Sequence, residues 1–271
     1  MTVDQPSTAA VAISLQGVSK TFTLPNGQKL NVVDDTSLTI RKGQFVCLLG
    51  PSGFGKSTVL NMVAGLVPAT GGSLHIDGEP VQSGQFAKNL GYVFQRDTTY
   101  PWRTVEKNIG LGLELAGVPL KQRRKRVQQA INDAGLGGFE QMFPSMLSGG
   151  MRQRVSLMRS LVMEPEILLM DEPFGALDAH TKLDMHRLLL EIWERQRQTV
   201  VFVTHDLAEA LVLSDQIVLL SARPGRITAT FDVPFARPRN ALQLPETPEY
   251  GQLFSSIWHA LGQEMVKASP P

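Results

Sequence analysis

The sequence contains one cysteine among 271 residues, and this scarcity excludes two kinds of structure. A single thiol cannot close an internal disulfide, and it cannot supply the ligands of a cysteine-rich metal centre. The residue, Cys47, lies within the apolar run from Phe45 to Leu49. Free cysteine packs as a small hydrophobic residue in such surroundings, so we expect Cys47 to be a core residue rather than a nucleophile.

The chain also has no excess of charge of either sign, with 26 basic against 25 acidic residues. Net charge therefore gives no reason to expect a nucleic acid as a partner. The apolar runs, such as Ile167 to Met170, are far shorter than the roughly 18 to 20 residues that a bilayer span requires. Residues Met1 to Thr8 do not show the basic and apolar stretches of a secretory signal. We expect a cytoplasmic protein that does not itself span the membrane.

Short apolar runs alternate with helical patterns over most of the chain. Such alternation is typical of a sheet wrapped by crossover helices, so the predicted fold class is α/β. The predicted strands are Phe45 to Leu49, Leu90 to Phe94, Ile167 to Met170, Val200 to Val203 and Ile217 to Leu220.

The stretch between the second and third of these strands has a helical character. Apolar residues recur there with spacings of i, i+3, i+4 and i+7 at Val127, Ala130, Ile131 and Ala134. This spacing defines one face of a helix, and Gly135 is placed to end that helix. We predict that residues from about 96 to 165 form a helical subdomain inserted into the core.

The two ends of the chain differ from this pattern. After Ala229 the sequence becomes rich in proline, before a last amphipathic stretch around Leu253 to Leu261. We expect residues 232–271 to form an appended C-terminal tail and residues 1–11 to form a flexible N-terminus.

The segment from Gly50 to Ser57 matches the phosphate-loop pattern G-x-x-x-x-G-K-[ST], between a predicted strand and a helix predicted from Lys56 to Gly65. Glycines let successive backbone N–H groups face the same phosphate oxygens, and the positive end of the helix adds to the attraction. Lys56 would bind the β- and γ-phosphates of ATP, and Ser57 would bind Mg²⁺. A glycine-rich turn before an ordinary helix is the alternative interpretation. The residues predicted to bind nucleotide here are Gly50, Pro51, Ser52, Gly53, Phe54, Gly55, Lys56, Ser57 and Thr58.

Two adjacent acids, Asp171 and Glu172, follow the apolar strand that begins at Ile167. Ligands of open α/β sheets bind at the carboxyl ends of the strands, which is where these side chains are expected. Asp171 is placed to orient Mg²⁺, and Glu172 is placed to polarise the water that attacks the γ-phosphate. A solvated acidic pair would be the alternative if no phosphate loop preceded it.

The segment Leu147-Ser148-Gly149-Gly150-Met151-Arg152-Gln153 completes a set of motifs that resembles the ATP-binding subunits of ABC transporters. The resemblance implies a P-loop NTPase fold: a RecA-like core with a mixed sheet, an inserted α-helical subdomain and an antiparallel β part near the N-terminus. It covers the chain from about Ile13 to Arg226, so residues 12–231 are predicted to form the ABC ATPase domain. Read alone, Ser148 would be a helix N-cap.

The same resemblance implies further roles for residues between and around these motifs. In this family the Ser148, Gly149 and Gly150 segment binds ATP held by the other protomer. Gln95 would contact Mg²⁺ and the attacking water, and His205 would contact the γ-phosphate. The resemblance also implies that Asp178 senses the opposite site and that Phe22 stacks on adenine, with a helix N-cap and a core phenylalanine as the respective alternatives. The predicted catalytic residues are Glu172, His205, Gln95 and Lys56, and the predicted metal ligands are Ser57, Gln95 and Asp171.

The implied partners follow from the same family. We expect a homodimer joined through the nucleotide sites, two transmembrane permease subunits, and indirectly a substrate-binding protein, at the cytoplasmic face of the cell membrane. Trp102 is the candidate permease contact, with simple packing as the alternative. The basic run Lys121 to Arg126 is expected to be a solvated helix face rather than a lipid contact.

Three segments resemble the nitrate, sulfonate and taurine class of bacterial importers: Tyr100-Pro101-Trp102, Gly150 to Arg154, and Ser221 to Arg226. They point to uptake of a small anion, with an importer of an unrelated small organic solute as the alternative. A soluble ABC ATPase of translation or DNA repair usually carries two cassettes or a long coiled-coil insert, and neither is present in this sequence. A phosphate-loop kinase would give no reason for Leu147 to Gly150 or for His205.

Overall fold

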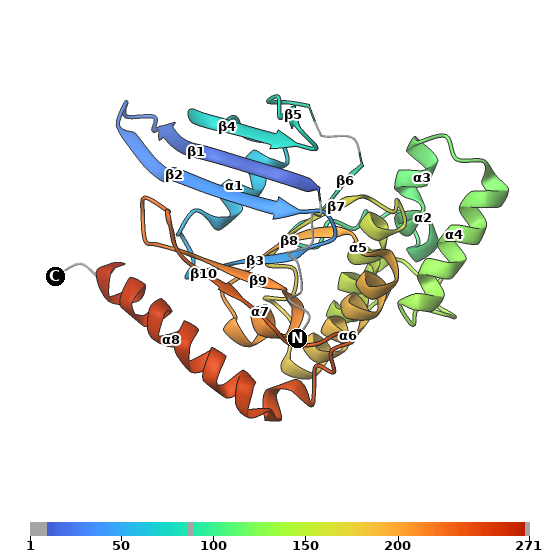
Figure 1. Cartoon of the computed structure of the whole chain (residues 1–271). Coiled ribbons are helices and arrows are strands. Elements are labelled where there is room, and N and C mark those ends of the chain that lie inside the picture. Colours follow the sequence, from blue (N-terminus) through green and yellow to red (C-terminus); the bar gives the residue numbers. More distant parts are fainter. Residues whose placement is uncertain (1–9, 86–88, 269–271) are drawn as a thin grey trace.

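The computed structural model describes residues 10–85 and 89–268, which form two sheets and a surrounding set of helices (Figure 1). The larger sheet has the strand order β10-β9-β3-β8-β7-β6. Its parallel strands are β3 (Phe45–Leu49), β6 (Leu90–Val93), β7 (Ile167–Asp171), β8 (Thr199–Thr204) and β9 (Gln216–Leu220). The edge strand β10 (Ile227–Asp232) pairs antiparallel with β9, so the sheet is mixed as predicted.

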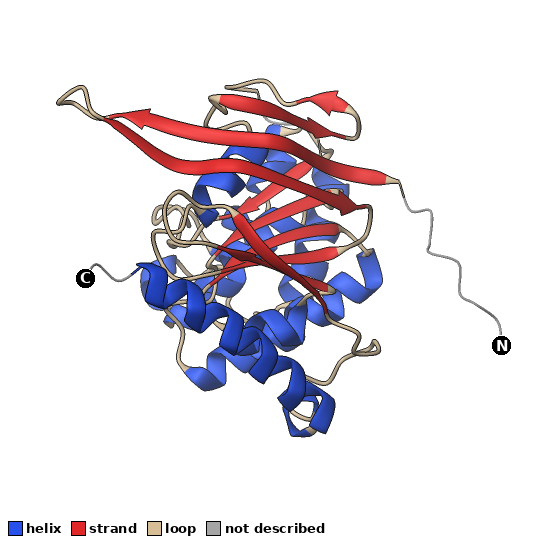
Figure 2. Ribbon diagram, turned by 60° about the vertical axis from the view of Figure 1, so that its left-hand side comes forward, coloured by secondary structure: helices blue, strands red, loops and turns tan. Residues whose placement is uncertain are grey.

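The smaller sheet is antiparallel and has the order β2-β1-β4-β5. Its strands are β1 (Val11–Thr23), β2 (Lys29–Arg41), β4 (Gly71–Ile76) and β5 (Glu79–Pro80). Figure 2 shows this sheet lying across the mixed sheet, with most of the helices on the opposite side. The antiparallel β part near the N-terminus is thereby confirmed.

The two faces of the mixed sheet bury alternate residues of each strand, because successive side chains of a strand point to opposite sides. On β3, Val46 and Leu48 pack with helix α1 (Lys56–Val63) and the antiparallel sheet. Phe45, Cys47 and Leu49 pack on the other face with α6 (Ala179–Gln196) and α7 (Leu207–Leu213). Cys47 is completely buried, as predicted, and burial raises the pKa of its thiol well above the ordinary value.

The predicted helical stretch contains α2 (Val105–Ile109), α3 (Leu111–Leu115), α4 (Leu120–Asp133), a 3-10 turn at Pro144–Met146, and α5 (Gly149–Leu161). The four apolar residues predicted to share one face of α4 and its end are all buried. Gly135 follows α4 with a φ of 63°, a left-handed conformation that suits glycine after a helix. The basic run from Lys121 to Arg126 lies mostly exposed on α4. The subdomain boundaries near residues 96 and 165 stay predictions.

Two predicted elements end earlier than expected. The strand beginning at Leu90 ends at Val93, and Phe94 is 40% exposed. Helix α1 ends at Val63 rather than Gly65, because Gly65 adopts a φ of 73° that a helix does not use.

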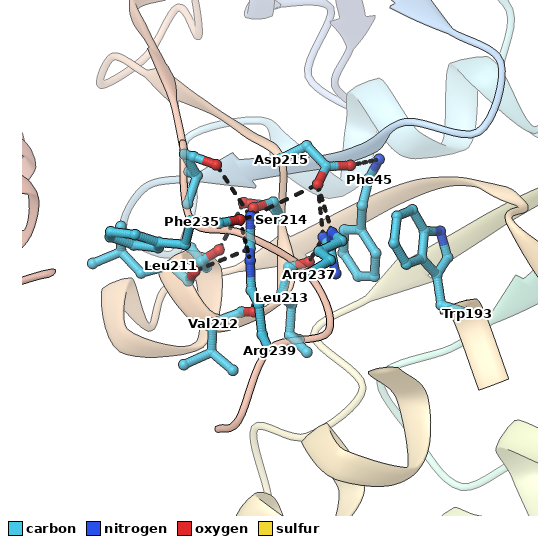
Figure 3. Close-up of polar contacts among 12 residues, drawn as sticks. Phe45, Trp193, Leu211, Val212, Leu213, Ser214, Asp215, Phe235, Arg237 and Arg239 are labelled. Atoms are coloured by element: carbon cyan, nitrogen blue, oxygen red, sulfur yellow. Dashed lines mark hydrogen bonds and ion pairs between the residues drawn. The ribbon is translucent and has the colours of Figure 1, made fainter. Parts of the chain in front are cut away.

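The tail packs against the core through two arginines whose side chains are at most 10% exposed (Figure 3). Arg239 has only 1% of its side chain exposed and donates hydrogen bonds to main-chain carbonyls at the end of α7 and in the tail itself. Its shortest bond, 2.6 Å, goes to the Ser214 carbonyl. Arg237 pairs with Asp215 at 2.8 Å and lies over the Trp193 ring at 4.0 Å. Burial, followed by repulsion from Arg237, lowers the pKa of Arg239 to about 10, which leaves it charged at neutral pH.

Beyond these arginines, a 3-10 turn at Leu244–Glu246 leads into α8 (Pro248–Ala268), which packs on α7. Tyr250 stacks with Phe235 and Phe254 at centroid distances of 6.1 Å. Whether residues 232–271 form a separate unit stays a prediction. None of the helices in residues 10–85 and 89–268 is long and apolar enough to cross a bilayer.

We predict that Arg239→Met lowers the free energy of unfolding by about 3 kcal/mol, because it removes the donor from several buried carbonyls. Urea unfolding followed by circular dichroism would measure the change. Arg187→Met, on the exposed side of α6, is the matched control and should change stability by no more than about 0.5 kcal/mol. Equal stabilities for the two variants would contradict a structural role for Arg239.

Candidate active site

The predicted phosphate loop lies between β3 and α1, and its conformation depends on glycine. Gly53 and Gly55 adopt φ angles of 85° and 86°. A Cβ atom at Gly55 would also lie 3.0 Å from both the Val32 carbonyl oxygen and the Val33 Cγ2 atom. A residue with a side chain would be strained here by its backbone and by its neighbours. The glycine requirement predicted from the motif is therefore explained by the fold.

Lys56 lies inside this loop, with only 3% of its side chain exposed. Its ammonium group donates hydrogen bonds to the carbonyl oxygens of Gly50 at 2.6 Å and Pro51 at 2.9 Å, and it lies 3.4 Å from Glu172 Oε1. Burial lowers the pKa of Lys56, and the nearby Glu172 carboxylate opposes that shift. The loop thus holds a cation next to its backbone N–H groups, where a polyphosphate would bind.

Ser57 and Asp171 meet at the carboxyl ends of the strands. The Ser57 hydroxyl donates to Asp171 Oδ1 at 2.8 Å, although 114 residues separate the two. Burial raises the pKa of Asp171, and the hydrogen bond from Ser57 opposes that shift. A hydroxyl and a carboxylate in contact fit Mg²⁺, which proteins bind through one or two carboxylates together with substrate phosphates.

Glu172 forms the centre of the polar network. Its Oε2 atom lies 3.0 Å from His205 Nδ1 and accepts a hydrogen bond from Gln95 Nε2 at 3.4 Å. Its backbone has a φ of 41°, a left-handed conformation that is uncommon for a residue other than glycine, and its N–H donates to the Val203 carbonyl at 2.9 Å. Strained backbone of this kind persists where neighbouring structure fixes it, and it is frequent at active sites.

Eight of the predicted site residues line one cavity of about 390 Å³. Its lining consists of Val32, Ser52, Gly53, Gly55, Lys56, Ser57, Thr58, Gln95, Glu172 and Arg223. His205 reaches the cavity through Glu172, and Asp171 reaches it through Ser57. The sequence interpretation missed Val32 and Arg223. No sequence signal marked Val32, whereas Arg223 lies in the Ser221 to Arg226 segment that was used only for subfamily resemblance.

The side chains of three other predicted nucleotide-binding residues do not line this cavity. Phe54 is only 7% exposed and packs in the core, so its backbone alone is available to a phosphate. Pro51 contributes its carbonyl to Lys56. Phe22 is 36% exposed and carries the Lys20 ammonium 4.8 Å from its ring centre. Adenine stacking on Phe22 stays a prediction.

Ser148, Gly149, Gly150 and Asp178 form a second group, away from the cavity lining. Ser148 accepts a hydrogen bond from the Met151 N–H at 3.3 Å and caps α5. Asp178 accepts from the N–H groups of His180 and Thr181 and caps α6. The two helix starts touch, since a Cβ atom on Gly150 would lie 2.5 Å from Thr181 Cγ2. Both N-cap interpretations are confirmed, and the chain therefore carries two separate groups of predicted nucleotide-binding residues.

The fold and the first group of residues define a P-loop nucleotide hydrolase. Comparison with known proteins then gives the family: the ABC transporter family model matches residues 33–175, and the chain belongs to that family of ATP-binding, ATP-hydrolysing proteins. An uncharacterized ABC transporter ATP-binding protein of Methanocaldococcus jannaschii is 41% identical, over 95% of this chain and 94% of that protein.

Two further relatives are import ATP-binding proteins. A taurine import ATP-binding protein of Rhizobium johnstonii is 42% identical over 87% of this chain and 91% of its own length. A nitrate import ATP-binding protein of Synechococcus elongatus is 40% identical over 93% and 94%. Among solved structures, a dimeric ATP-binding cassette in a post-hydrolysis state with ADP and Pi aligns with a TM-score of 0.72 and 30% identity. The alignment covers 83% of this chain and 100% of the chain in the solved structure.

We predict that Asp171→Asn stabilises the nucleotide-free protein at pH 7 while lowering ATP hydrolysis at least about a hundredfold. The folded state raises the pKa of Asp171, so the folded protein retains that proton more readily than the unfolded chain does. The contribution of Asp171 to the free energy of unfolding therefore falls as the pH rises above the pKa that this group has in the unfolded chain. Asparagine does not ionise, so the substitution removes this loss of stability.

Thermal unfolding at pH 7 and near pH 3.5 would test this sign, because the difference between Asp171→Asn and the wild type should shrink at the lower pH. Asp232→Asn, at an exposed position, is the control and should leave both the midpoint and hydrolysis close to wild type. A less stable Asp171→Asn protein at pH 7 would contradict the burial argument.

Proposed function

We propose that this chain is the ATP-hydrolysing subunit of an ABC importer, in which two copies enclose two ATP molecules. The observation that carries the proposal is the separation of the two groups of predicted nucleotide-binding residues. The phosphate-loop cavity contains Lys56 and Glu172, whereas Ser148 and Gly150 begin a different helix and do not line that cavity. A second copy would bring its Ser148 helix start to the first copy's nucleotide, where N–H groups and the helix dipole favour an anion.

Within one site, the side chains divide the work of hydrolysis by position. Lys56 neutralises charge on the β- and γ-phosphates from inside the loop. Glu172 lies 3.0 Å from His205 and within reach of Gln95, so it can accept a proton from a water held between these groups. Ser57 and Asp171 would hold Mg²⁺, which supplies charge stabilisation to the phosphates when bound. Loss of the γ-phosphate then removes the contact that joins the two copies.

The helical subdomain offers a surface for the permease subunits. A cavity of about 800 Å³ lies between α2, α3 and α4, and Trp102 lines it with 71% of its surface exposed. The Trp102 ring stacks on Tyr100 at 5.1 Å, which presents a flat aromatic surface to solvent. Exposed tryptophan is enriched in protein interfaces. We therefore assign this cavity to a cytoplasmic segment of a permease subunit, so that the two copies of the chain bind the two permease subunits.

The importer assignment rests on the taurine and nitrate import proteins that share about 40% identity with this chain. It places the chain peripherally at the cytoplasmic face of the cell membrane, with a substrate-binding protein reached through the permease. The proposed cargo is a small anion of the nitrate, sulfonate or taurine kind. Reconstitution with the permease and binding protein, followed by ATPase assays with individual anions, tests the cargo. If only an unrelated organic solute stimulated ATP hydrolysis, that solute would replace the nitrate, sulfonate and taurine class as the proposed cargo.

We predict that Glu172→Gln binds ATP, forms a stable dimer and loses turnover, because the amide cannot accept the proton from water. Size-exclusion chromatography with MgATP and a phosphate-release assay would measure both effects. Glu191→Gln, at an exposed position on α6, is the charge-matched control and should hydrolyse ATP normally. Normal turnover by Glu172→Gln would show that this residue does not have its proposed role. The dimer proposal would be wrong if the protein were active as an obligate monomer and if Ser148→Arg left its activity unchanged.

We predict that Trp102→Ala weakens binding to the permease by about thirtyfold or more, as measured by co-purification, since a central aromatic contact is commonly worth about 2 kcal/mol or more. Trp258→Ala, on α8 with 55% of that tryptophan exposed, is a matched control for loss of a surface indole. Both variants should unfold at the wild-type temperature. Equal co-purification of the two variants would show that the permease binds elsewhere.

A further inference from the structure

The loop joining β9 to β10, orange in Figure 1, brings an additional arginine to the phosphate loop. Arg223 lines the same cavity as Lys56, Ser57 and Glu172. Its Nε donates a hydrogen bond to the Gly53 carbonyl at 3.0 Å, and its Nη2 atom lies 3.6 Å from the position of a Cβ on Gly53. The guanidinium therefore lies directly against the turn that holds phosphate in proteins with this motif.

The backbone around Arg223 is fixed by contacts on both sides. Gly225 donates its N–H to the Val32 carbonyl at 2.9 Å, and its carbonyl accepts the Asp34 N–H at 3.0 Å. A Cβ atom at Gly225 would lie 2.3 Å from the Phe54 carbonyl oxygen, so this loop approaches the phosphate loop as closely as a backbone can. The position of Arg223 beside the cavity is a consequence of this packing, since the loop has little freedom to move away.

The charges near the loop leave Arg223 available for an anion. The neighbouring Arg226 forms an ion pair with Asp34, on the side of β2. In residues 10–85 and 89–268 Arg223 forms no ion pair, and its hydrogen bond to the Gly53 carbonyl uses Nε alone. The Glu172 carboxylate in the cavity lies within ion-pair distance of Lys56 and His205. Within the described part of the chain, the two Nη groups of Arg223 thus have no hydrogen-bond partner, and they lie at the edge of a polyphosphate cavity.

We propose that Arg223 is a nucleotide-binding residue that contacts the phosphate chain of ATP from outside the phosphate loop. The proposal rests on the nucleotide site described above and adds a second cation to Lys56. A planar guanidinium donates two parallel hydrogen bonds to phosphate oxygens, which a lysine cannot reproduce. Because the attraction is electrostatic, its contribution grows with the charge of the nucleotide.

Equilibrium binding of a non-hydrolysable ATP analogue, ADP and AMP to the full chain, each with Mg²⁺, tests this inference. We expect Arg223→Gln to raise the Kd of the ATP analogue about three- to tenfold, with a smaller rise for ADP and the smallest for AMP. Arg223→Lys should fall between the wild type and Arg223→Gln, because it keeps the charge but loses the paired geometry. The control is Arg187→Gln, which removes one exposed arginine charge from α6 and should leave each Kd at the wild-type value.

Two results would overturn the inference while leaving the nucleotide site intact. One is an unchanged Kd for the ATP analogue in Arg223→Gln. The other is an equal rise for all three nucleotides accompanied by a lower unfolding temperature, which would make Arg223 a support for the loop rather than a ligand of phosphate. Failure of the wild type to bind the ATP analogue would instead overturn the nucleotide site itself, and with it this inference.

Discussion

The parallel pairing of β3, β7 and β8 is the constraint on which the site depends. In this register Leu49 pairs with Thr204, and Asp171 pairs with Val203, so the carboxyl ends of the three strands lie level with one another. Each strand continues directly into a functional segment: the phosphate loop after β3, Glu172 after β7 and His205 after β8. Both faces of these strands are buried, so a shift of one residue in any strand would move each side chain into the opposite core, and the cost of repacking both cores fixes the register.

The charged groups at these strand ends are buried, although water would solvate their charges better. Burial lowers the pKa of Lys56 and raises the pKa of Asp171, so each group is easier to neutralise than it would be in solvent. Contacts with Glu172 and Ser57 oppose those shifts. Burying these groups lowers the stability of the isolated chain, but it places the charges before the substrate binds. Preorganised sites lower the barrier to phosphoryl transfer in this way. The left-handed backbone of Glu172 belongs to the same compromise.

The sequence predicted the five parallel strands of the mixed sheet and the phosphate loop because strong local patterns mark them: apolar runs for the strands and a rigid motif for the loop. It missed the edge strand β10, whose residues alternate between partly buried and exposed and so form no apolar run. It predicted the boundaries of those elements less accurately, since Phe94 is exposed and Gly65 ends α1 early. Arg223 was missed because its position depends on how the β9–β10 loop packs against β2, a contact between residues about 190 apart in the chain. The tail contacts were missed for a similar reason, because no local pattern shows that Arg239 would bind the end of α7.

The Arg239 contacts also join the tail to the end of α7. The resemblance covered the chain only to Arg226, yet three carbonyls at the end of α7, those of Leu211, Val212 and Ser214, receive their side-chain donor from Arg239. Helix α7 begins two residues after His205, so its anchoring and the placement of that histidine are linked through a single short helix. A shortened protein ending at residue 231 would lose this donor and the tail contacts that cover α7. Residues beyond the last motif therefore help to anchor the helix that follows His205.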